Sequence, residues 1–308
     1  MKFSILLKTS REIVLELKTE EIYNTKKPYE IYINDKFIKK SNKIVESIYD
    51  LHPGTTYSLY LKNEDKISDS VEFTMEEEFV TLNVRDFGAK GDGINNDTPF
   101  IQAAILSCPK KGRVLIPKGT YKVASIFLRS DLVLELEKGA VLSAFTDRNK
   151  FPILPGLVES YNEKEEYNLG SWEGNPLDSF ASILTGIHVS NVLICGEGII
   201  DGCADFDNWW KNPKVKDGAY RPRMIFLNHC ENVIVQGITI QNSPAWNIHP
   251  YFSNQLRFLD LKVIGPANSH NTDGLNPESC EDVEIIGSYF SVGDDCIAVK
   301  SGKIYMGK

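Results

Sequence analysis

Long hydrophobic runs are missing from the sequence, which excludes a protein anchored by membrane-spanning helices. No apolar segment reaches the about 18 consecutive residues that such a helix requires, and the stretch between Lys2 and Lys8 is too short for the apolar region of a secretory signal. No membrane partner is therefore predicted. The 308-residue sequence predicts a cytoplasmic location and leaves secretion as the alternative.

An excess of basic residues is also missing. The 34 Lys and Arg residues are outnumbered by 42 Asp and Glu residues, which gives a formal net charge of −8. Proteins that bind nucleic acids are usually basic, so this balance argues against a nucleic-acid partner. It argues less strongly against other acidic ligands, because a local cluster of Lys and Arg can set the field in a cleft.

Motifs for metals and nucleotides are absent as well. The six cysteines show no CxxC spacing, so neither zinc nor any other metal is predicted. A glycine-rich stretch, residues 86–93, precedes a predicted helix at residues 100–107, but it lacks the GxGxxG pattern and the P-loop Lys. No cofactor is predicted. We expect this helix to cap the open end of a solenoid.

The sequence does contain a repeated pattern of short apolar strands. Runs rich in Val and Ile recur along the chain, and four of them begin at Asn191, Asn232, Gln255 and Asp282. The last two steps are 23 and 27 residues, within the range of periods typical of solenoids. Runs this short, broken by Gly, Asn and Pro, indicate strands rather than helices. The predicted fold class is all-β, a right-handed parallel β-helix. Its coils stack about 4.8 Å apart, so equivalent turns lie side by side.

Three aspartates stand in two turns of this repeat. Asp273 belongs to one turn, and the adjacent Asp294 and Asp295 follow the apolar run of residues 283–292. A lone aspartate in a turn is usually just solvated, but here both turns occupy like positions on neighbouring coils. We therefore expect the three carboxylates to share one groove. Carboxylates that flank a sugar bond can protonate the leaving oxygen and activate a water, as in glycoside hydrolases.

These motifs resemble the polygalacturonases of glycoside hydrolase family 28. The resemblance covers the chain from about Val80 to its last residue, and it rests on motifs in the family's order: residues 198–202, 221–225, 242–246, His249-Pro250, Asn271-Thr272-Asp273 and Gly293-Asp294-Asp295. It implies hydrolysis of the α-1,4 galacturonosyl bonds of polygalacturonate or pectin, with inversion and without a metal. Polygalacturonate or oligogalacturonides are the implied partners.

The resemblance also implies a role for each carboxylate. Asp294 is the expected general acid, and Asp273 and Asp295 are expected to position and deprotonate water. The neighbouring carboxylates should help Asp294 to keep its proton, which predicts a mildly acidic optimum. Inverting glycosidases hold the two carboxyl groups about 6.5–9.5 Å apart, and we expect a separation of that kind.

Three further residues are predicted to bind substrate: Asn271, His249 and Lys300. Lys300 follows Asp295 closely, so its ammonium group could pair with a uronate carboxylate, although exposed lysines without a role are as common. For His249, a satisfied structural histidine is the alternative. The Trp209-Trp210 pair fits the core and a sugar-stacking surface equally well.

A long irregular stretch, residues 146–180, interrupts the repeat with prolines and aromatic residues. Long loops in compact domains are usually functional, so we expect this one to wall off one end of the groove. A closed end favours attack at the end of a polysaccharide chain, the exo mode. A passive surface insertion is the alternative.

We predict two domains, residues 1–78 and 79–308. The first alternates apolar and polar residues in short runs, for example at residues 13–17 and 57–61, which is typical of a small β-sandwich. Its stretch 51–57 resembles a turn of fibronectin type III modules, which bacterial exo-acting members of the family often carry. It holds no catalytic constellation, so a structural spacer is favoured over a carbohydrate-binding module.

The sequence departs from the family pattern after Asp295. The family carries a Gly-His-Gly motif and an Arg-x-Lys motif there, and neither occurs before Lys308. This predicts a chain truncated at its C-terminus, whose own activity is left open. The alternatives are a rhamnogalacturonan hydrolase, a pectate lyase-like enzyme with calcium and an arginine base, and a non-catalytic pectin-binding β-helix. The oligomeric state is not predicted.

Overall fold

The structure is a computed structural model that describes residues 1–64, 66–157 and 168–301. Its chain divides into two compact units, Met1–Val80 and Thr81–Lys308. No helix among the described residues is long and apolar enough to cross a membrane.

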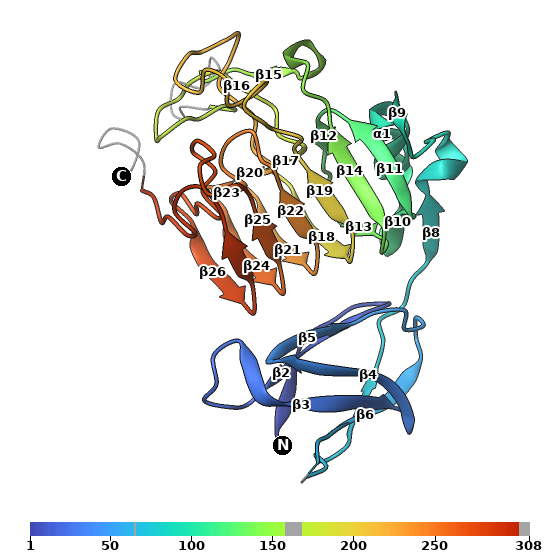
Figure 1. Cartoon of the computed structure of the whole chain (residues 1–308). Coiled ribbons are helices and arrows are strands. Elements are labelled where there is room, and N and C mark those ends of the chain that lie inside the picture. The colour runs from blue at the N-terminus through green and yellow to red at the C-terminus, as the bar shows by residue number, and fades with distance from the viewer. Residues whose placement is uncertain (65, 158–167, 302–308) are drawn as a thin grey trace. The chain divides into compact units, whose positions relative to one another are not determined.

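The first unit is a sandwich of two antiparallel sheets (Figure 1). One sheet has the order β1 (Phe3–Lys8), β2 (Ile13–Leu17) and β5 (Val45–Ile48). The other has the order β4 (Lys36–Lys43), β3 (Asn24–Ile33), β6 (Thr56–Lys62) and β7 (Val71–Thr74). Alternate residues such as Ile31, Leu59 and Leu61 are buried between the sheets, as the period of two along a strand requires.

The second unit is a parallel β-helix, which confirms the predicted fold class. Three parallel sheets run along it (Figure 1). The first contains β8 (Val80–Asn83), β10 (Gly112–Ile116), β13 (Leu132–Leu136), β18 (Ser190–Gly196), β21 (Glu231–Gln236), β24 (Asn254–Leu259) and β26 (Glu281–Ile286). The second contains β9 (Asp92–Asn96), β11 (Gly119–Val123), β14 (Ala140–Ala144), β19 (Ile199–Asp201), β22 (Thr239–Gln241), β25 (Lys262–Ile264) and β27 (Tyr289–Ser291). The third contains β12 (Ile126–Phe127), β17 (Leu184–Ile187), β20 (Ile225–Asn228) and β23 (Ile248–Tyr251).

The register of the coils follows the sequence repeat. Val192 pairs with Val233, and Val233 pairs with Leu256, so inward-facing apolar residues form continuous columns. These residues are fully or nearly fully buried, and such columns fill the interior of the β-helix.

A helix covers the first end of this core. The helix α1 (Thr98–Ser107) buries Ile101, Ala104 and Ile105 in the main hydrophobic cluster, as its sequence pattern predicts. Pro99 lies in its first turn, where a missing N–H costs nothing. The carboxylate of Asp97 accepts hydrogen bonds from the backbone N–H of Lys90 and Gly91 instead of capping α1.

The long connections leave the coil at one corner, between the second and the third sheet. The longest joins β14 to β17 and holds a short helix, η2 (Arg148–Lys150), and a hairpin of β15 (Ile153–Leu154) and β16 (Ser179–Phe180) (Figure 1). Equivalent loops on later coils are residues 202–224, 242–247, 265–274 and 292–296. This corner therefore brings together segments that are far apart in the sequence.

Candidate active site

The three predicted carboxylates meet at this corner. Leu275 pairs with Ile248 on one side and with Ile297 on the other, so the loops before these residues are stacked. One carboxylate oxygen from each of Asp273, Asp294 and Asp295 lies within 4.8 Å of the other two. The stacked loops thus place all three acids in one cluster, as the repeat predicts.

The carboxylates are closer together than we expected. Their nearest oxygens lie within 4.8 Å, below the about 6.5–9.5 Å separation of inverting glycosidases. The reason is that Asp273 and Asp295 occupy neighbouring coils, which stack about 4.8 Å apart. A single water can hydrogen-bond to both carboxylates across this gap, because two bonds of about 2.8 Å at a bent angle span it.

Asp273 differs from its two neighbours in burial. It is 4% exposed, whereas Asp294 and Asp295 are exposed. Burial raises the pKa of Asp273, and a hydrogen bond of 3.0 Å from Nδ2 of Asn276 opposes that rise. The charge of Asp294 raises this pKa further. The sequence led us to expect Asp294 as the proton-holding carboxyl, but the surroundings favour the protonated form at Asp273.

Lys300 lies beside Asp273 and over an aromatic ring. Its Nζ is 3.6 Å from Oδ2 of Asp273 and 4.6 Å from the centroid of the Trp246 ring. A bond of 2.9 Å from its backbone N–H to the carbonyl of Pro277 fixes its place on the coil. The side chain is 27% exposed, so the ammonium group is held at the site and still faces solvent.

Trp246 belongs to a stack of aromatic rings that crosses three loops. It stacks on Trp172 with the centroids 5.8 Å apart, and Trp172 stacks on Tyr220 at 4.9 Å. Trp172 comes from the long insertion between β14 and β17, so that insertion packs against the residues beside the carboxylates. Residues 158–167 of the predicted wall lie outside the described part of the chain.

His249 does not lie where we predicted. It is fully buried, and its Nε2 is 2.9 Å from Oε2 of the equally buried Glu278. Burial lowers the pKa of His249 to about 4, so the neutral ring donates its Nε2–H to the carboxylate. Its ring edge contacts Trp246 at a centroid distance of 4.9 Å. A residue without exposed surface cannot bind substrate directly, so the alternative interpretation, a satisfied structural histidine, is the right one.

Arg223 completes this buried network, and the sequence did not single it out. Its guanidinium lies over the rings of Trp172 and Trp246, at 5.2 and 5.5 Å, and donates a hydrogen bond to the carbonyl of Ser171. Burial lowers its pKa to about 10, and the negative charge of Glu278 opposes this change. Arg223 comes from the 221–225 motif and Glu278 follows Asp273 by five residues, but only the fold shows that they meet.

The side chain of Asn271 forms a hydrogen bond within the protein. Its backbone is left-handed, with φ 55°, and its Oδ1 accepts a bond of 2.7 Å from Nη2 of Arg221. The other end of that guanidinium donates to the carbonyls of Pro244 and His270. Arg221, which we had not assigned a role, thus ties the loop before Asp273 to the preceding coil. The predicted role of Asn271 as a substrate ligand stays a prediction.

The tryptophan pair is part of the core. Trp209 and Trp210 are 1% and 3% exposed, and Trp209 packs edge-on against Phe151 and Phe180. The indole N–H of Trp210 donates to the carbonyl of Ser243 at 3.1 Å. Of the two interpretations that the sequence allowed, the core is therefore the right one.

The three aspartates are also the residues that could hold a metal ion among those that the structure describes. Two of them are exposed, and exposed acidic clusters are common without an ion. The carboxylate cluster alone therefore does not point to a metal.

Comparisons with known proteins agree with this fold. Residues 160–307 match the family model of Glycosyl hydrolases family 28, and residues 81–134 match that of Rhamnogalacturonase A/epimerase, pectate lyase-like. A protein named probable polygalacturonase from Vitis vinifera is 33% identical over 224 residues, which are 70% of this chain and 43% of that protein. An exo-poly-alpha-D-galacturonosidase from Dickeya chrysanthemi is 27% identical over 265 residues, 72% of this chain and 42% of that protein. The chain thus spans less than half the length of these curated relatives.

Solved structures share the fold. A family 28 exopolygalacturonase from Yersinia enterocolitica superposes with a TM-score of 0.68 at 22% identity, over 98% of this chain and 66% of that one. An exopolygalacturonase from Thermotoga maritima superposes with a TM-score of 0.62 at 26% identity, over 74% of this chain and 56% of that one.

Proposed function

Because the chain belongs to glycosyl hydrolases family 28, we propose that it is a glycosidase that hydrolyses the α-1,4 galacturonosyl bonds of polygalacturonate. One observation carries the proposal: Asp273, Asp294 and Asp295 have carboxylate oxygens within 4.8 Å of one another, from turns of two stacked coils. Such carboxylates can protonate a leaving oxygen and activate a water when the two stacked coils hold one water between them, and the proposal of inversion follows the family rather than the separation.

In the proposed mechanism, Asp273 and Asp295 hold the attacking water. They lie at equivalent positions on neighbouring coils, so one water can donate to both carboxylates and be turned towards the anomeric carbon. Asp294 is exposed to solvent and donates its proton to the glycosidic oxygen. The attack comes from the face opposite the leaving group, which gives inversion.

The raised pKa of Asp273 supports a second assignment, in which Asp273 is the acid and the exposed pair activates water. The variants Asp273→Asn and Asp294→Asn distinguish the two. Loss of the general acid spares substrates whose leaving group needs no proton, such as an aryl glycoside with an acidic phenol. The variant that keeps activity on the aryl galacturonide but loses it on polygalacturonate therefore identifies the acid.

Lys300 gives the proposed site its preference for an acidic sugar. Its ammonium group lies beside the carboxylate cluster, 3.6 Å from Asp273, and the Lys300 side chain is still partly exposed. A uronate carboxylate in the groove can form a charge-assisted hydrogen bond with it. A neutral galactan lacks that partner and meets three carboxylates instead.

We further propose the exo mode. The stacking of Trp172 on Trp246 attaches the insertion between β14 and β17 to the site. This attachment supports a substrate groove that is closed at the end where the insertion lies. The names of several relatives describe them as exo-acting. The match of residues 81–134 to a rhamnogalacturonase and epimerase model keeps a rhamnogalacturonan hydrolase as the second candidate.

The experiment is a reducing-end assay with the 308-residue chain on polygalacturonate and on rhamnogalacturonan. We expect reducing ends from polygalacturonate, no near-ultraviolet absorbance from an unsaturated product, and a loss of about 100-fold or more in Asp294→Asn. Asp282→Asn is the matched control, since Asp282 is an exposed aspartate of β26 outside the carboxylate cluster. An absorbing product indicates a lyase, and binding without any new reducing ends indicates a non-catalytic β-helix; either result contradicts the proposal.

A further inference from the structure

The first unit contains a cavity of about 310 Å³ at one end of its sandwich. It lies between the end of β2 in one sheet and the start of β3 in the other, and the residues before β1 and after β6 close it. The volume is at the lower end of the about 300–1,000 Å³ range of small-molecule sites. It is large enough for one or two sugar rings.

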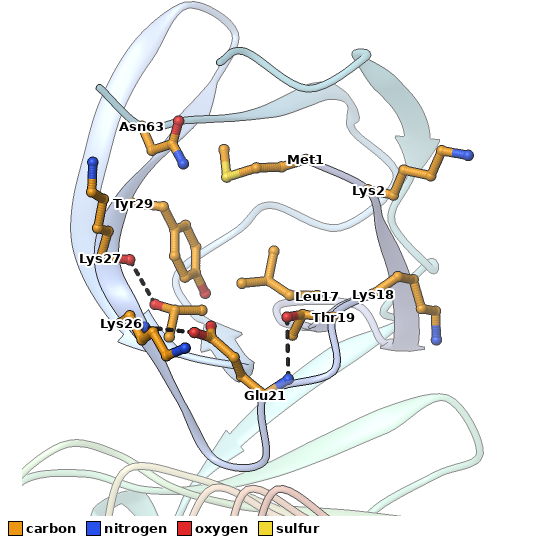
Figure 2. Close-up of a pocket in the computed structure, with 11 residues that line it drawn as sticks. Met1, Lys2, Leu17, Lys18, Thr19, Glu21, Lys26, Lys27, Tyr29 and Asn63 are labelled. Atoms are coloured by element: carbon orange, nitrogen blue, oxygen red, sulfur yellow. Dashed lines mark hydrogen bonds between the residues drawn. The ribbon is translucent and has the colours of Figure 1, made fainter. Parts of the chain in front are cut away.

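The floor of this cavity is apolar. The side chains of Leu17 and Tyr29 are 6% and 1% exposed and line it together with Met1 (Figure 2). The hydroxyl group of Tyr29 donates to the carbonyl of Lys43 at 2.7 Å, which fixes the buried ring beneath the cavity. Met1 is partly exposed, unlike these two buried side chains, so its flexible thioether chain is the apolar surface on which the C–H face of a sugar can pack.

The rim of the cavity is basic. Four lysines line it against one acidic residue, Glu21. Figure 2 shows Lys2 and Lys18 on one side of the cavity and Lys26 and Lys27 on the other. This balance is the reverse of the whole chain, whose net charge is −8. A local positive field of this kind concentrates anions at a cavity.

The lysines differ in how free they are to bind a ligand. Lys18 is paired with Glu16, and Lys27 with Glu64 at 3.5 Å. Lys2 and Lys26 are exposed, and their ammonium groups have no ion-pair partner among the described residues. These two ammonium groups lie on opposite sides of the cavity. An acidic ligand gains the most binding free energy by pairing with them.

We propose that this cavity is a binding site for an acidic sugar, a mono- or disaccharide of uronate type. The sugar ring packs on Met1, and its carboxylates pair with Lys26 and Lys2. The choice of a uronate rests on the proposed function, since hydrolysis of polygalacturonate supplies such saccharides. The first unit then acts as a carbohydrate-binding module rather than only as the spacer that the sequence favoured.

The test follows the methyl group of Met1 by NMR in the full chain, labelled with ¹³C-methyl methionine and carrying Asp294→Asn to prevent turnover. Met1 lines the cavity, Met75 is buried in the same sandwich, and Met224 is buried in the β-helix. We expect digalacturonate to shift the Met1 signal saturably and to leave Met75 unchanged. Neutral digalactose should have no effect on Met1.

The variant Lys2→Ala/Lys26→Ala should weaken this binding about fivefold, because an exposed ion pair contributes up to about 1 kcal/mol. The matched control is Lys36→Ala/Lys40→Ala, two exposed lysines of β4 that do not line the cavity. An unchanged Met75 signal shows that the sandwich is still folded. The proposal is overturned if digalacturonate does not shift the Met1 signal, if digalactose shifts it equally, or if the control variant weakens digalacturonate binding equally. Reducing-end release is measured separately, so hydrolysis without a Met1 shift refutes only the binding site, and a shift without hydrolysis refutes only the proposed function.

Discussion

Asp273 and Glu278 are both buried carboxylates, but their partners differ. Glu278 has a direct hydrogen bond with His249 and the charge of Arg223 nearby, whereas Asp273 has Asn276 and the more distant ammonium group of Lys300. The charge of Glu278 is therefore compensated inside the protein. That of Asp273 is compensated less, which suits a group that must exchange protons or hold water.

Glu278→Gln removes the carboxylate. The buried positive charge of Arg223 then has no compensating negative charge from Glu278. Removing one partner of a buried pair costs about 3–5 kcal/mol, so we expect a loss of that size in the free energy of unfolding, measured with urea. The control is Glu284→Gln, which removes an exposed partner of Arg257 and should cost less than about 1 kcal/mol. Equal losses in the two variants contradict the buried network.

Lys300→Met tests the cation of the site. The positive charge of Lys300 lowers the pKa of Asp273, so its removal should raise that pKa. If Asp273 must be ionised to activate water, the acidic limb of the activity profile then moves to higher pH. The KM for polygalacturonate should rise about tenfold with the loss of the charged contact. Lys262→Met, on the exposed side of β25, is the control, and an unmoved acidic limb refutes the role of Lys300.

At the scale of the elements, left-handed residues set the register of the coils. Asn191, Asn232, Gln255 and Asp282 all have φ between 50° and 57°, and each is the second residue of a strand of the first sheet. Asn and Asp tolerate this conformation better than other side chains do. A polar residue therefore precedes the apolar run on each of these coils, although Gln255 shows that Asn or Asp is not required.

Asn232→Val tests that turn. A β-branched residue at φ 52° is strained and should lower the free energy of unfolding by about 1–3 kcal/mol. Asn232→Gly keeps the left-handed conformation and loses mainly the hydrogen bond from Nδ2 of Asn232 to Oδ1 of Asn191. Thermal unfolding should therefore rank wild type and Gly above Val. A Val variant as stable as the Gly variant contradicts the argument.

Trp172→Ala tests the insertion between β14 and β17. Without the ring between Tyr220 and Trp246, the insertion loses its attachment to the site. We expect cleavage within the polysaccharide to appear, so that viscosity falls faster for each reducing end released. Trp172→Phe keeps an aromatic contact and serves as the control. An unchanged ratio of viscosity loss to reducing ends in the Ala variant refutes the wall.

At the scale of the whole molecule, the sequence predicted the features that depend on its periodic pattern. It missed the contacts between loops that are far apart in the sequence. The strands and the approach of Asp273 to Asp294 and Asp295 follow from the repeat, and the end-covering helix follows from its own apolar pattern. The network of Arg223, His249 and Glu278 could not be predicted, because its members lie on three different coils and only their burial reveals the contact. The position of Trp172 depends on a long insertion without periodic pattern.

The central claim is that the carboxylate cluster hydrolyses galacturonosyl bonds with inversion, and ¹H NMR of a fresh reaction tests it most directly. The chain is mixed with trigalacturonate, and the anomeric signals of the first product are followed before mutarotation. The account predicts that the β-anomer of the new reducing end appears first and then equilibrates with the α-anomer. An α-anomer that appears first shows retention, and a spectrum without any new anomeric signal shows that the chain does not cleave this substrate; either result contradicts the account.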